Sequence, residues 1–342
     1  MAKNPRVVFF EMEAWHKQYV KRHAPKDWDL AIFKEALTLD TLALAGDATV
    51  ISVFVFSDMS CAVISNLPEL QLICTRSTGY DHIHLDSCCE RSIVVSNVPR
   101  YGENTVAEHA FGLILSLSRN IYHAYQHTLQ LDFSLKGLRG FDLKGKTLGV
   151  VGAGAIGLHV IRIAKGFGMD VLAYDTREQP MLAEVMGFRY VPLKELLANS
   201  DVISLHVPLI PETFHLINNE TIRMIRKGAL LINTARGAIV DTGAVVTALD
   251  EGILAGAGLD VLEGEEAIKE EAQLLGRELP VEKLRAIVQS YALLHRDNVI
   301  ITPHIGFYSV EAEERLLHTT IGNIEGFLRG EPRNVIFHGC ST

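Results

Sequence analysis

The chain has 342 residues, a length that predicts about two domains, each large enough for its own hydrophobic core. Its composition is that of a globular protein, with 48% hydrophobic and 21% charged residues. The net charge of −9 argues against a general nucleic-acid-binding or membrane-surface protein, because both favour basic patches. We therefore expect neither nucleic acid nor membrane as a partner.

The N-terminal segment and the cysteines favour a cytoplasmic protein. Val7–Phe10 is too short for the apolar core of a signal peptide, and no apolar run is long enough to span a bilayer. The five cysteines are odd in number and lack zinc-ligand spacing, so we expect free thiols in a reducing compartment and no metal site.

Residues 1–100 have the pattern of a compact α/β unit without a phosphate-binding loop. Short apolar runs predict strands at Val7–Phe10, Val50–Phe56, Leu72–Cys74 and Ile93–Val95, with helices between them, for example Ile32–Leu39. Thr75–Asp81 is a loop of mostly small residues whose backbone N–H groups could bind an anion. On this stretch alone, an ordinary strand-to-helix turn is the simpler interpretation.

A domain boundary is predicted at Asn97–Gly102, which contains Pro and Gly. Thr105–Glu108 then has the pattern of a capping box that opens a helix through about Tyr125. This helix carries more apolar surface than one core requires. We therefore expect part of it to pack on a partner subunit.

The middle of the chain contains a dinucleotide-binding pattern. The apolar strand Leu148–Val151 is followed by Gly152, Gly154 and Gly157, in the spacing G-x-G-x-x-G. A helix is predicted over Leu158–Phe167, with Gly168 as its stop, and then a strand over Met169–Tyr174 that ends at Asp175.

Each part of this pattern has a role in binding a dinucleotide. The first glycine permits a tight turn, the second lets the backbone approach a pyrophosphate, and the third lets the helix pack closely on the strand. Free N–H groups at the helix N-terminus favour the phosphate charge. Asp175 stands where an acid would bind the ribose hydroxyls and repel a 2′-phosphate, which favours NAD over NADP.

Strands and helices alternate from Thr147 to Thr302, which predicts a doubly wound parallel sheet with its ligand at the carboxyl ends of the strands. The further predicted strands are Val202–Leu205, Ala229–Asn233, Gly256–Leu259 and Val299–Ile301. Ser309–Arg329 is predicted to be a helix that returns to the first domain, followed by a short tail at Pro332–Phe337.

Three ionisable residues, Arg236, Glu265 and His304, follow strands of this predicted sheet. Arginine can hold a small carboxylate through its planar fork of donors, and a histidine beside a carboxylate can donate a proton near neutral pH. With a nicotinamide that supplies hydride, such a set reduces a 2-keto acid. Singly, each residue has a simpler interpretation, as a turn cap, part of a solvated acidic stretch, or a surface histidine. Their joint placement favours chemistry.

On these residues the chain resembles a D-isomer-specific 2-hydroxyacid dehydrogenase over nearly its whole length. The matching stretches are Tyr101–His109, Gly152–Gly157 with Asp175, Ser200–Leu209, Ile232–Gly237, Gly258–Val261 and Ile301–His304. Within that family it looks most like the D-lactate dehydrogenases, through Tyr101, Glu263–Glu265 and Phe307–Tyr308.

The resemblance implies an α/β fold of two Rossmann-like or flavodoxin-like domains, with doubly wound parallel sheets and the active site in the cleft between them. Residues 1–101 and 303–342 would form the substrate-binding domain, and residues 102–302 the NAD-binding domain. A homodimer would form through the helix that begins near Thr105.

The resemblance also implies roles for individual residues. Arg236, Glu265 and His304 would be the catalytic set, and Thr78, Gly79, Tyr101 and Arg236 would bind the substrate. NAD would be held by Gly152, Gly154, Ala155, Ile156, Gly157, Asp175, Val207, Pro208, Thr213, Thr234, Ala235 and Asp260, with Asp260 near the nicotinamide amide.

The expected activity is NAD-dependent reduction of pyruvate or a near relative to the D-hydroxy acid. Other 2-keto acids, such as glyoxylate, hydroxypyruvate or bulkier ones, stay open, and so does an NAD-sensing protein like the family's corepressors. Formate is disfavoured by Glu265, where formate enzymes have glutamine. Two stretches depart from the lactate enzymes: Phe56–Ser60, and the long Glu266–Asn298 with an extra helix near Val281–Leu294.

Overall fold

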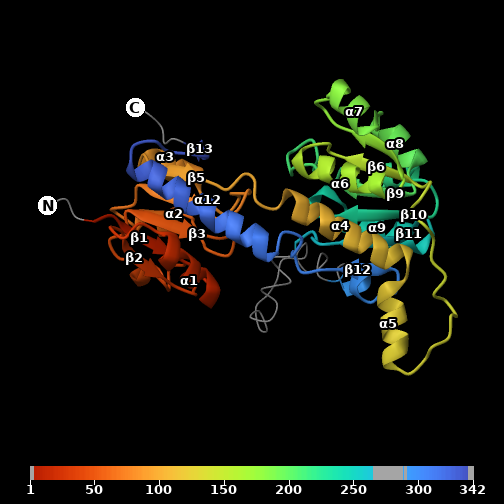
Figure 1. Ribbon diagram of the computed structural model, residues 1–342, viewed down its shortest axis with the longest axis horizontal. Coiled ribbons are helices and arrows are strands. Elements are labelled where there is room, and N and C mark those ends of the chain that lie inside the picture. The colour runs from red at the N-terminus through yellow and green to blue at the C-terminus, as the bar shows by residue number, and fades with distance from the viewer. Residues whose placement is uncertain (1–3, 265–287, 289–290, 338–342) are drawn as a thin grey trace. The chain divides into compact units, whose positions relative to one another are not determined.

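The computed structural model describes residues 4–264, 288 and 291–337 (Figure 1). The chain forms two compact units, which we call unit 1 (Met1–Tyr101 and Ser309–Thr342) and unit 2 (Gly102–Tyr308). The chain leaves unit 1 after Tyr101. The chain returns to unit 1 at Ser309 rather than at residue 303.

Unit 1 contains a six-stranded sheet in the order β13-β5-β4-β3-β1-β2. All neighbours are parallel except β13, which pairs antiparallel with β5, and the order 2-1-3-4-5 of the first five strands is flavodoxin-like. Its elements are β1 (Arg6–Phe9), α1 (Ala14–His23), β2 (Asp29–Ile32), η1 (Leu42–Leu44), β3 (Val50–Val53), α2 (Cys61–Ser65), β4 (Leu72–Thr75), α3 (Leu85–Glu90), β5 (Val94–Ser96), α12 (Val310–Leu328) and β13 (Val335–Phe337).

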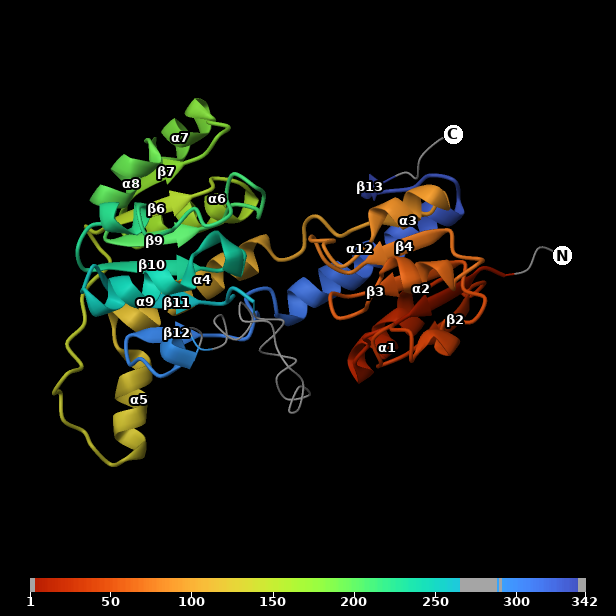
Figure 2. The same ribbon diagram turned by 180° about the vertical axis from the view of Figure 1, so that it is seen from behind.

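The sheet of unit 1 is buried on both faces, as parallel sheets usually are. Val8, on β1, packs with residues of α2 and α3. Val7, its neighbour along the same strand, packs on the other face with residues of α12, which lies beside α1. Figures 1 and 2 show these helices on opposite faces. Alternate strand residues therefore supply two separate cores, which explains why the strands are apolar runs without polar alternation.

Unit 2 contains a seven-stranded, all-parallel sheet in the order β12-β11-β10-β9-β6-β7-β8. Its elements are α4 (Glu103–Ser118), α5 (Ile121–Leu129), β6 (Thr147–Val151), α6 (Ala155–Gly166), β7 (Asp170–Tyr174), α7 (Pro180–Met186), β8 (Arg189–Tyr190), α8 (Leu193–Asn199), β9 (Val202–Leu205), η2 (Thr221–Met224), β10 (Ala229–Asn233), η3 (Gly237–Ile239), α9 (Thr242–Asp250), β11 (Leu254–Leu259) and β12 (Val299–Ile301).

Helices cover both faces of this sheet too. The α4 and α6 helices share one hydrophobic core with β6, β7 and β10, and α8 and α9 share the other. The predicted doubly wound α/β architecture is therefore confirmed. Among the helices of the described ranges, none is both long and apolar enough to cross a membrane.

The predicted helix Ile32–Leu39 is wrong. Ile32 ends β2, and the residues after it continue to pair with the end of β1 and the loop that follows it. The Phe33 N–H donates to the Phe9 carbonyl at 2.8 Å, and the Glu11 N–H donates to the Glu35 carbonyl at 2.9 Å. These long-range backbone hydrogen bonds replace the local ones that a helix would need.

The helix predicted from Thr105 to Tyr125 is two helices. The first begins at Glu103 with Gly102 as its N-cap, so the predicted capping box at Thr105 is also wrong. Asn120, with φ 50°, interrupts the run in the left-handed region. The Phe141 N–H donates to the Ser118 carbonyl at 2.8 Å and thereby caps the end of α4. A distant segment of the chain, not the local pattern, sets this break.

Three smaller expectations also change. The strand predicted over Val50–Phe56 ends at Val53, and the predicted tail at Pro332–Phe337 contains strand β13. Most of the helix expected near Val281–Leu294 lies outside the described residues. The residues of this range that the structure describes, 288 and 291–294, are helical.

The cysteines differ in part from the prediction. Cys61, Cys74 and Cys88 are free, and burial raises the pKa of Cys74 to about 12. Cys89, however, is disulfide-bonded, so the expectation of free thiols throughout is wrong. The cysteines therefore no longer support a cytoplasmic location, because disulfides are typical of oxidising compartments. The cytoplasmic location stays a prediction.

Candidate active site

The chain order of the unit 2 sheet reverses between β6 and β9, the point at which doubly wound sheets bind ligands. Gly152, directly after β6, has φ 97°, and a Cβ there would lie 2.8 Å from the backbone carbon of His206. A Cβ on Gly157 would overlap the Gly152 carbonyl. Only glycine fits these two positions, whereas a Cβ on Gly154 would have no atom within 4 Å, so the space beside Gly154 is open.

Helix α6 begins at this loop, with Gly154 as its N-cap and no hydrogen bond from a capping side chain in the described residues. The N-terminal positions Ala155 and Ile156 therefore stand where N–H groups can take an anion. Asp175, at the end of β7, accepts hydrogen bonds from the N–H groups of Ala153 at 2.8 Å and Arg177 at 2.9 Å. Its carboxylate is thus oriented beside the glycine loop.

Two buried polar atoms of the described part of unit 2 lack a hydrogen-bond partner at this same edge: Nδ1 of His206 and Oγ1 of Thr234. Burial lowers the pKa of His206 to about 3, so its ring is neutral at physiological pH, and its Nε2 lies 2.8 Å from the Ser204 hydroxyl. Buried polar atoms without partners are costly, and a bound polar ligand can satisfy them. The residues at this edge therefore fit a dinucleotide.

The segment after β9 forms a compact turn at this edge. The Thr213 hydroxyl donates to the Pro208 carbonyl at 2.6 Å and accepts from the Ile210 N–H at 2.9 Å. Val207 is half-buried, next to His206. The sequence-predicted cofactor residues after β6, β7, β9 and β10 thus share the carboxyl edge of one sheet.

Arg236 follows β10 in a turn that Asn233 organises. The Asn233 side chain accepts from the Ala235 N–H at 3.0 Å and donates to the Arg236 carbonyl at 2.9 Å. The half-buried guanidinium of Arg236 donates to the Ala235 carbonyl at 2.8 Å, which keeps the side chain near the turn. Asn233 was not predicted as a site residue, although it stands in the motif that carries Arg236.

His304 lies in a loop wrapped around the carboxylate of Asp260, which is 2% exposed. Asp260 accepts hydrogen bonds from the Thr302 hydroxyl at 2.5 Å and from the N–H groups of Ile305 at 2.9 Å and Gly306 at 2.8 Å. His304 itself has φ 58°, and its N–H donates to the Asp260 carbonyl at 2.9 Å. Asp260 therefore orders the turn that presents the half-buried imidazole.

His109, on α4, completes this cluster. Its Nε2 lies 3.2 Å from the Asp260 carboxylate and 2.9 Å from the Thr302 hydroxyl. The sequence contained His109 in a matching stretch but gave it no role. A local sequence pattern cannot predict this contact, because His109 is far from Asp260 and Thr302 in the chain.

Asp260→Asn is expected to lower the free energy of unfolding at pH 7 by about 2 kcal/mol, because buried N–H donors would lose a charged acceptor. Burial raises the pKa of Asp260, but hydrogen bonds from His109, Thr302 and Gly306 outweigh it and leave the pKa below its ordinary value. Such a group stabilises the fold above its unfolded pKa, and the contribution is lost as the pH falls through the folded value. Denaturant unfolding should therefore show the full difference in unfolding free energy between the two proteins at pH 7. The difference should disappear as the pH falls below about 4. An equal difference at both pH values would contradict this role.

Of the other predicted residues, Thr78, Gly79 and Tyr101 belong to unit 1. The Thr78 hydroxyl donates to the Val98 carbonyl at 3.0 Å, and the Thr78 carbonyl accepts from the Asn97 side chain at 2.8 Å, so this loop is well anchored. The Tyr101 carbonyl accepts from Arg315 at 2.7 Å. Glu265, the third predicted catalytic residue, lies outside the described residues.

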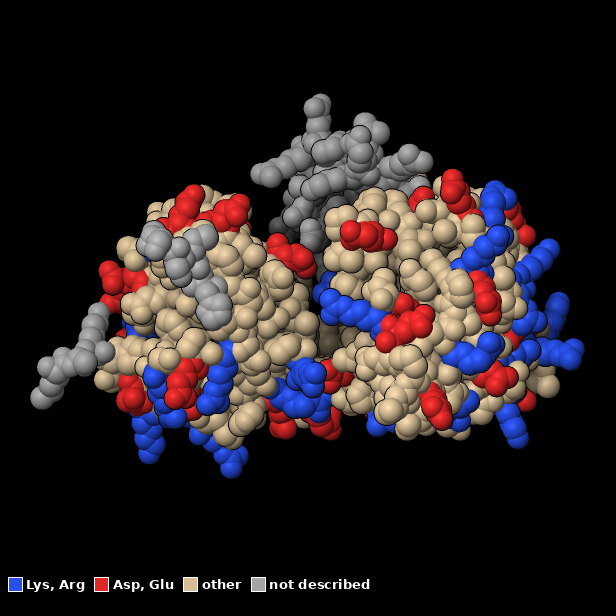
Figure 3. Space-filling model, turned by 90° about the horizontal axis from the view of Figure 1, so that it is seen from above, with Lys and Arg blue, Asp and Glu red and all other residues tan. Residues whose placement is uncertain are grey.

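Acidic and basic side chains are interspersed on the face shown in Figure 3. The whole chain is acidic, with a net charge of −9. A small anionic substrate would therefore be held by individual donors rather than by a general positive field. In unit 2, Arg236 is placed to be such a donor.

The sheet order, the glycine loop and Asp175 define a dinucleotide-binding α/β protein of the Rossmann type. Comparison with known proteins makes this more specific, since the profile described as "D-isomer specific 2-hydroxyacid dehydrogenase, NAD binding domain" matches residues 111–306. The chain belongs to this family of oxidoreductases, and unit 2 binds NAD.

Individual relatives cover almost the whole chain. The D-lactate dehydrogenase of Escherichia coli is 35% identical over 325 residues, 92% of this chain and 95% of that protein. The glyoxylate reductase of Pyrococcus furiosus is 34% identical over 329 residues, 94% of this chain and 87% of that protein. The crystal structure of D-lactate dehydrogenase from Aquifex aeolicus, complexed with NAD and lactic acid, has a TM-score of 0.82 at 37% identity and covers 95% of this chain and 96% of that one.

Proposed function

We propose that this protein reduces a small 2-keto acid, pyruvate or a near relative, to the D-2-hydroxy acid. The main support is that Arg236 and His304 follow β10 and β12, which flank β11 at the same sheet edge as the NAD-binding loop. Strands separated by one neighbour lie about 10 Å apart, a span that one small acid and its donors can fill. Relatives named D-lactate dehydrogenase favour pyruvate, whereas relatives named glyoxylate reductase keep glyoxylate as the alternative.

In the proposed reaction Arg236 binds the substrate carboxylate through two parallel N–H donors and polarises the adjacent carbonyl. His304 donates a proton to the carbonyl oxygen as it becomes a hydroxyl. Glu265 would hold the imidazole in its proton-donating form, and the N–H groups of Thr78 and Gly79 would add donors to the carboxylate. NADH, when bound, supplies the hydride.

The test of this proposal is NADH oxidation against pyruvate, glyoxylate, hydroxypyruvate, 2-ketobutyrate and phenylpyruvate. Rapid turnover of one small acid, with the D-hydroxy acid as product, would establish the substrate. Tight NADH binding without turnover of any acid would overturn the proposal and favour an NAD-sensing protein.

We further propose a homodimer formed through what we call the arm, residues 121–135, which contains α5. Figures 1 and 2 show the arm extending away from the body of unit 2. The arm exposes large apolar side chains by 52% to 85%, a clustering typical of interfaces. They are Ile121, Tyr122, Tyr125, Leu129, Leu131, Phe133 and Leu135. The core-facing residues of α4 are buried within unit 2. The excess apolar surface expected for the helix that begins near Thr105 therefore lies mainly in the arm.

The double substitution Leu131→Arg and Leu135→Arg should convert the dimer to a monomer, since two buried unpaired charges would be costly at its interface. Sedimentation velocity would then show a species of 37.8 kDa in place of one twice that mass. Met181→Arg is a matched control, because Met181 is 79% exposed on α7, outside the arm. A wild type that sediments as a monomer would rule out this dimer.

A further inference from the structure

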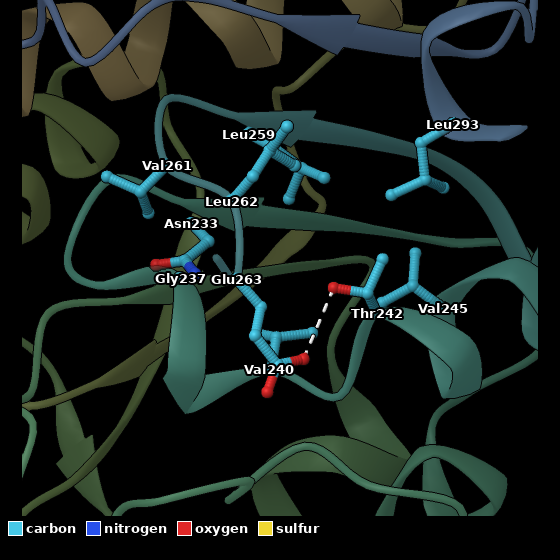
Figure 4. A pocket seen from close by; sticks show the side chains of 10 residues that line it. All are labelled: Asn233, Gly237, Val240, Thr242, Val245, Leu259, Val261, Leu262, Glu263 and Leu293. Carbon is cyan, nitrogen blue, oxygen red and sulfur yellow. Dashed lines mark hydrogen bonds between the residues drawn. The ribbon is translucent and has the colours of Figure 1, made fainter. Parts of the chain in front are cut away.

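A second pair of ionisable side chains lies at the carboxyl edge of unit 2, beside the site described above. Nε2 of His215 lies 2.6 Å from Oε1 of Glu263, and the two side chains are 29% and 25% exposed. An ionised carboxylate only accepts hydrogen bonds, so Nε2 carries the hydrogen. The Thr242 hydroxyl lies 3.5 Å from the other carboxylate oxygen. Figure 4 shows Glu263 and Thr242 facing each other at the edge of a small hollow.

The pair joins two segments that both rest on the turn after Arg236. On one side, the His215 N–H donates to the Ala238 carbonyl at 2.9 Å, and the Ile217 N–H donates to the Ile239 carbonyl at 3.1 Å. On the other side, the backbone of Leu262 and Glu263 lies against Gly237, where a Cβ would overlap the Leu262 carbonyl.

Local contacts also hold the His215 side chain in place. His215 has φ 47°, in the left-handed region, and its ring stacks on Phe214 with centroids 4.0 Å apart. Its carbonyl accepts from the Asn218 side chain at 3.0 Å. A half-buried hydrogen bond to a carboxylate, held by such fixed geometry, is stronger than a contact between mobile surface side chains.

We propose that His215 and Glu263 are positioning residues for this oxidoreductase site. Their hydrogen bond holds residues 261–264 against the turn that carries Arg236, and so fixes the direction from which the guanidinium meets the substrate carboxylate. The inference rests on the proposed function.

Glu263→Ala should raise the KM for the 2-keto acid by about tenfold, because small misplacements of binding groups have large effects on reactive geometry. The Kd for NADH, measured by its fluorescence, should change less than about twofold, since the glycine loop and Asp175 are untouched. Glu263→Gln should restore most of the loss, because the amide oxygen can still accept from Nε2. His215→Asn, which suits the left-handed backbone but is too short to reach Glu263, should match Glu263→Ala.

The double variant Glu263→Ala with His215→Asn should be no worse than either single one, which is the sign of a coupled pair. Glu313→Ala is the matched control, because it breaks a histidine–glutamate pair of 2.9 Å in unit 1 and should lower Tm without raising KM. Three results would overturn this inference and leave the proposed function intact. They are additive effects in the double variant, an unchanged KM in both single variants, and the same KM change in Glu313→Ala. A wild type without turnover of any 2-keto acid would overturn the proposed function and this inference with it.

Discussion

His304→Asn is expected to lower kcat/KM for the preferred 2-keto acid by about 10²- to 10⁴-fold, the usual contribution of a general acid. Asparagine suits this position because residue 304 has φ 58°, a conformation that asparagine tolerates better than alanine does. The N–H groups of Ile305 and Gly306 would still donate to Asp260, so the turn should keep its shape. The amide cannot donate a proton to the carbonyl oxygen, and the loss is therefore chemical.

The Kd for NADH separates this explanation from misfolding. It should stay within about twofold of the wild-type value, because His304 is not among the residues that hold the dinucleotide at β6 and β7. His304→Ala should show the same loss of turnover together with a lower Tm, since alanine is strained at a positive φ. Full activity in His304→Asn would show that another group is the acid.

The parts of the fold that the sequence predicts well are those with a local physical cause. The strand, glycine turn and helix at residues 147–166 follow from an apolar run and from glycines that a Cβ would exclude at Gly152 and Gly157. Asp175 could be identified because its distance from that loop is set by one helix and one strand. Arg236 and His304 could be located at the sheet edge because both follow recognisable buried strands.

The parts that sequence reasoning missed depend on contacts between distant segments. The residues after β2 look helical by their spacing, yet their backbone pairs with the loop after β1. The end of α4 is set by Phe141, and the turn around His304 is ordered by Asp260 with His109. Neither the break in the helix nor this cluster has a local signature, because the partners are brought together only by the completed sheet.

The histidines also differ in how far the sequence predicts their surroundings. The sequence has 14 of them, and the sequence analysis gives a catalytic role to His304 alone. His206 is half-buried and neutral, His109 contacts Asp260, and His215 pairs with Glu263. Their roles follow from what surrounds each ring, which no count or spacing conveys. The structure thus shows the contacts of three further histidines of unit 2.

Arg236→Gln is expected to lower kcat/KM for the 2-keto acid by at least about 10³-fold, since a bidentate charge-assisted contact and the polarisation of the carbonyl are both lost. The Asn233 side chain bonds to the backbone of Ala235 and Arg236, not to the guanidinium, so the turn should persist. Arg236→Lys should recover little, because an ammonium keeps the charge but cannot present two parallel donors.

Arg223→Gln is the matched control, because it removes an arginine of the same unit whose side chain is 61% exposed and paired with Glu251. Its activity should equal that of the wild type, as exposed ion pairs contribute little. In Arg236→Gln, NADH binding should persist while oxamate, a non-reacting mimic of the substrate, no longer binds the NADH complex. If oxamate still bound with wild-type affinity, the carboxylate would have another main anchor, and the N–H groups of Thr78 and Gly79 would become the first candidates. The two results thus assign the anion-binding role either to unit 2 or to unit 1.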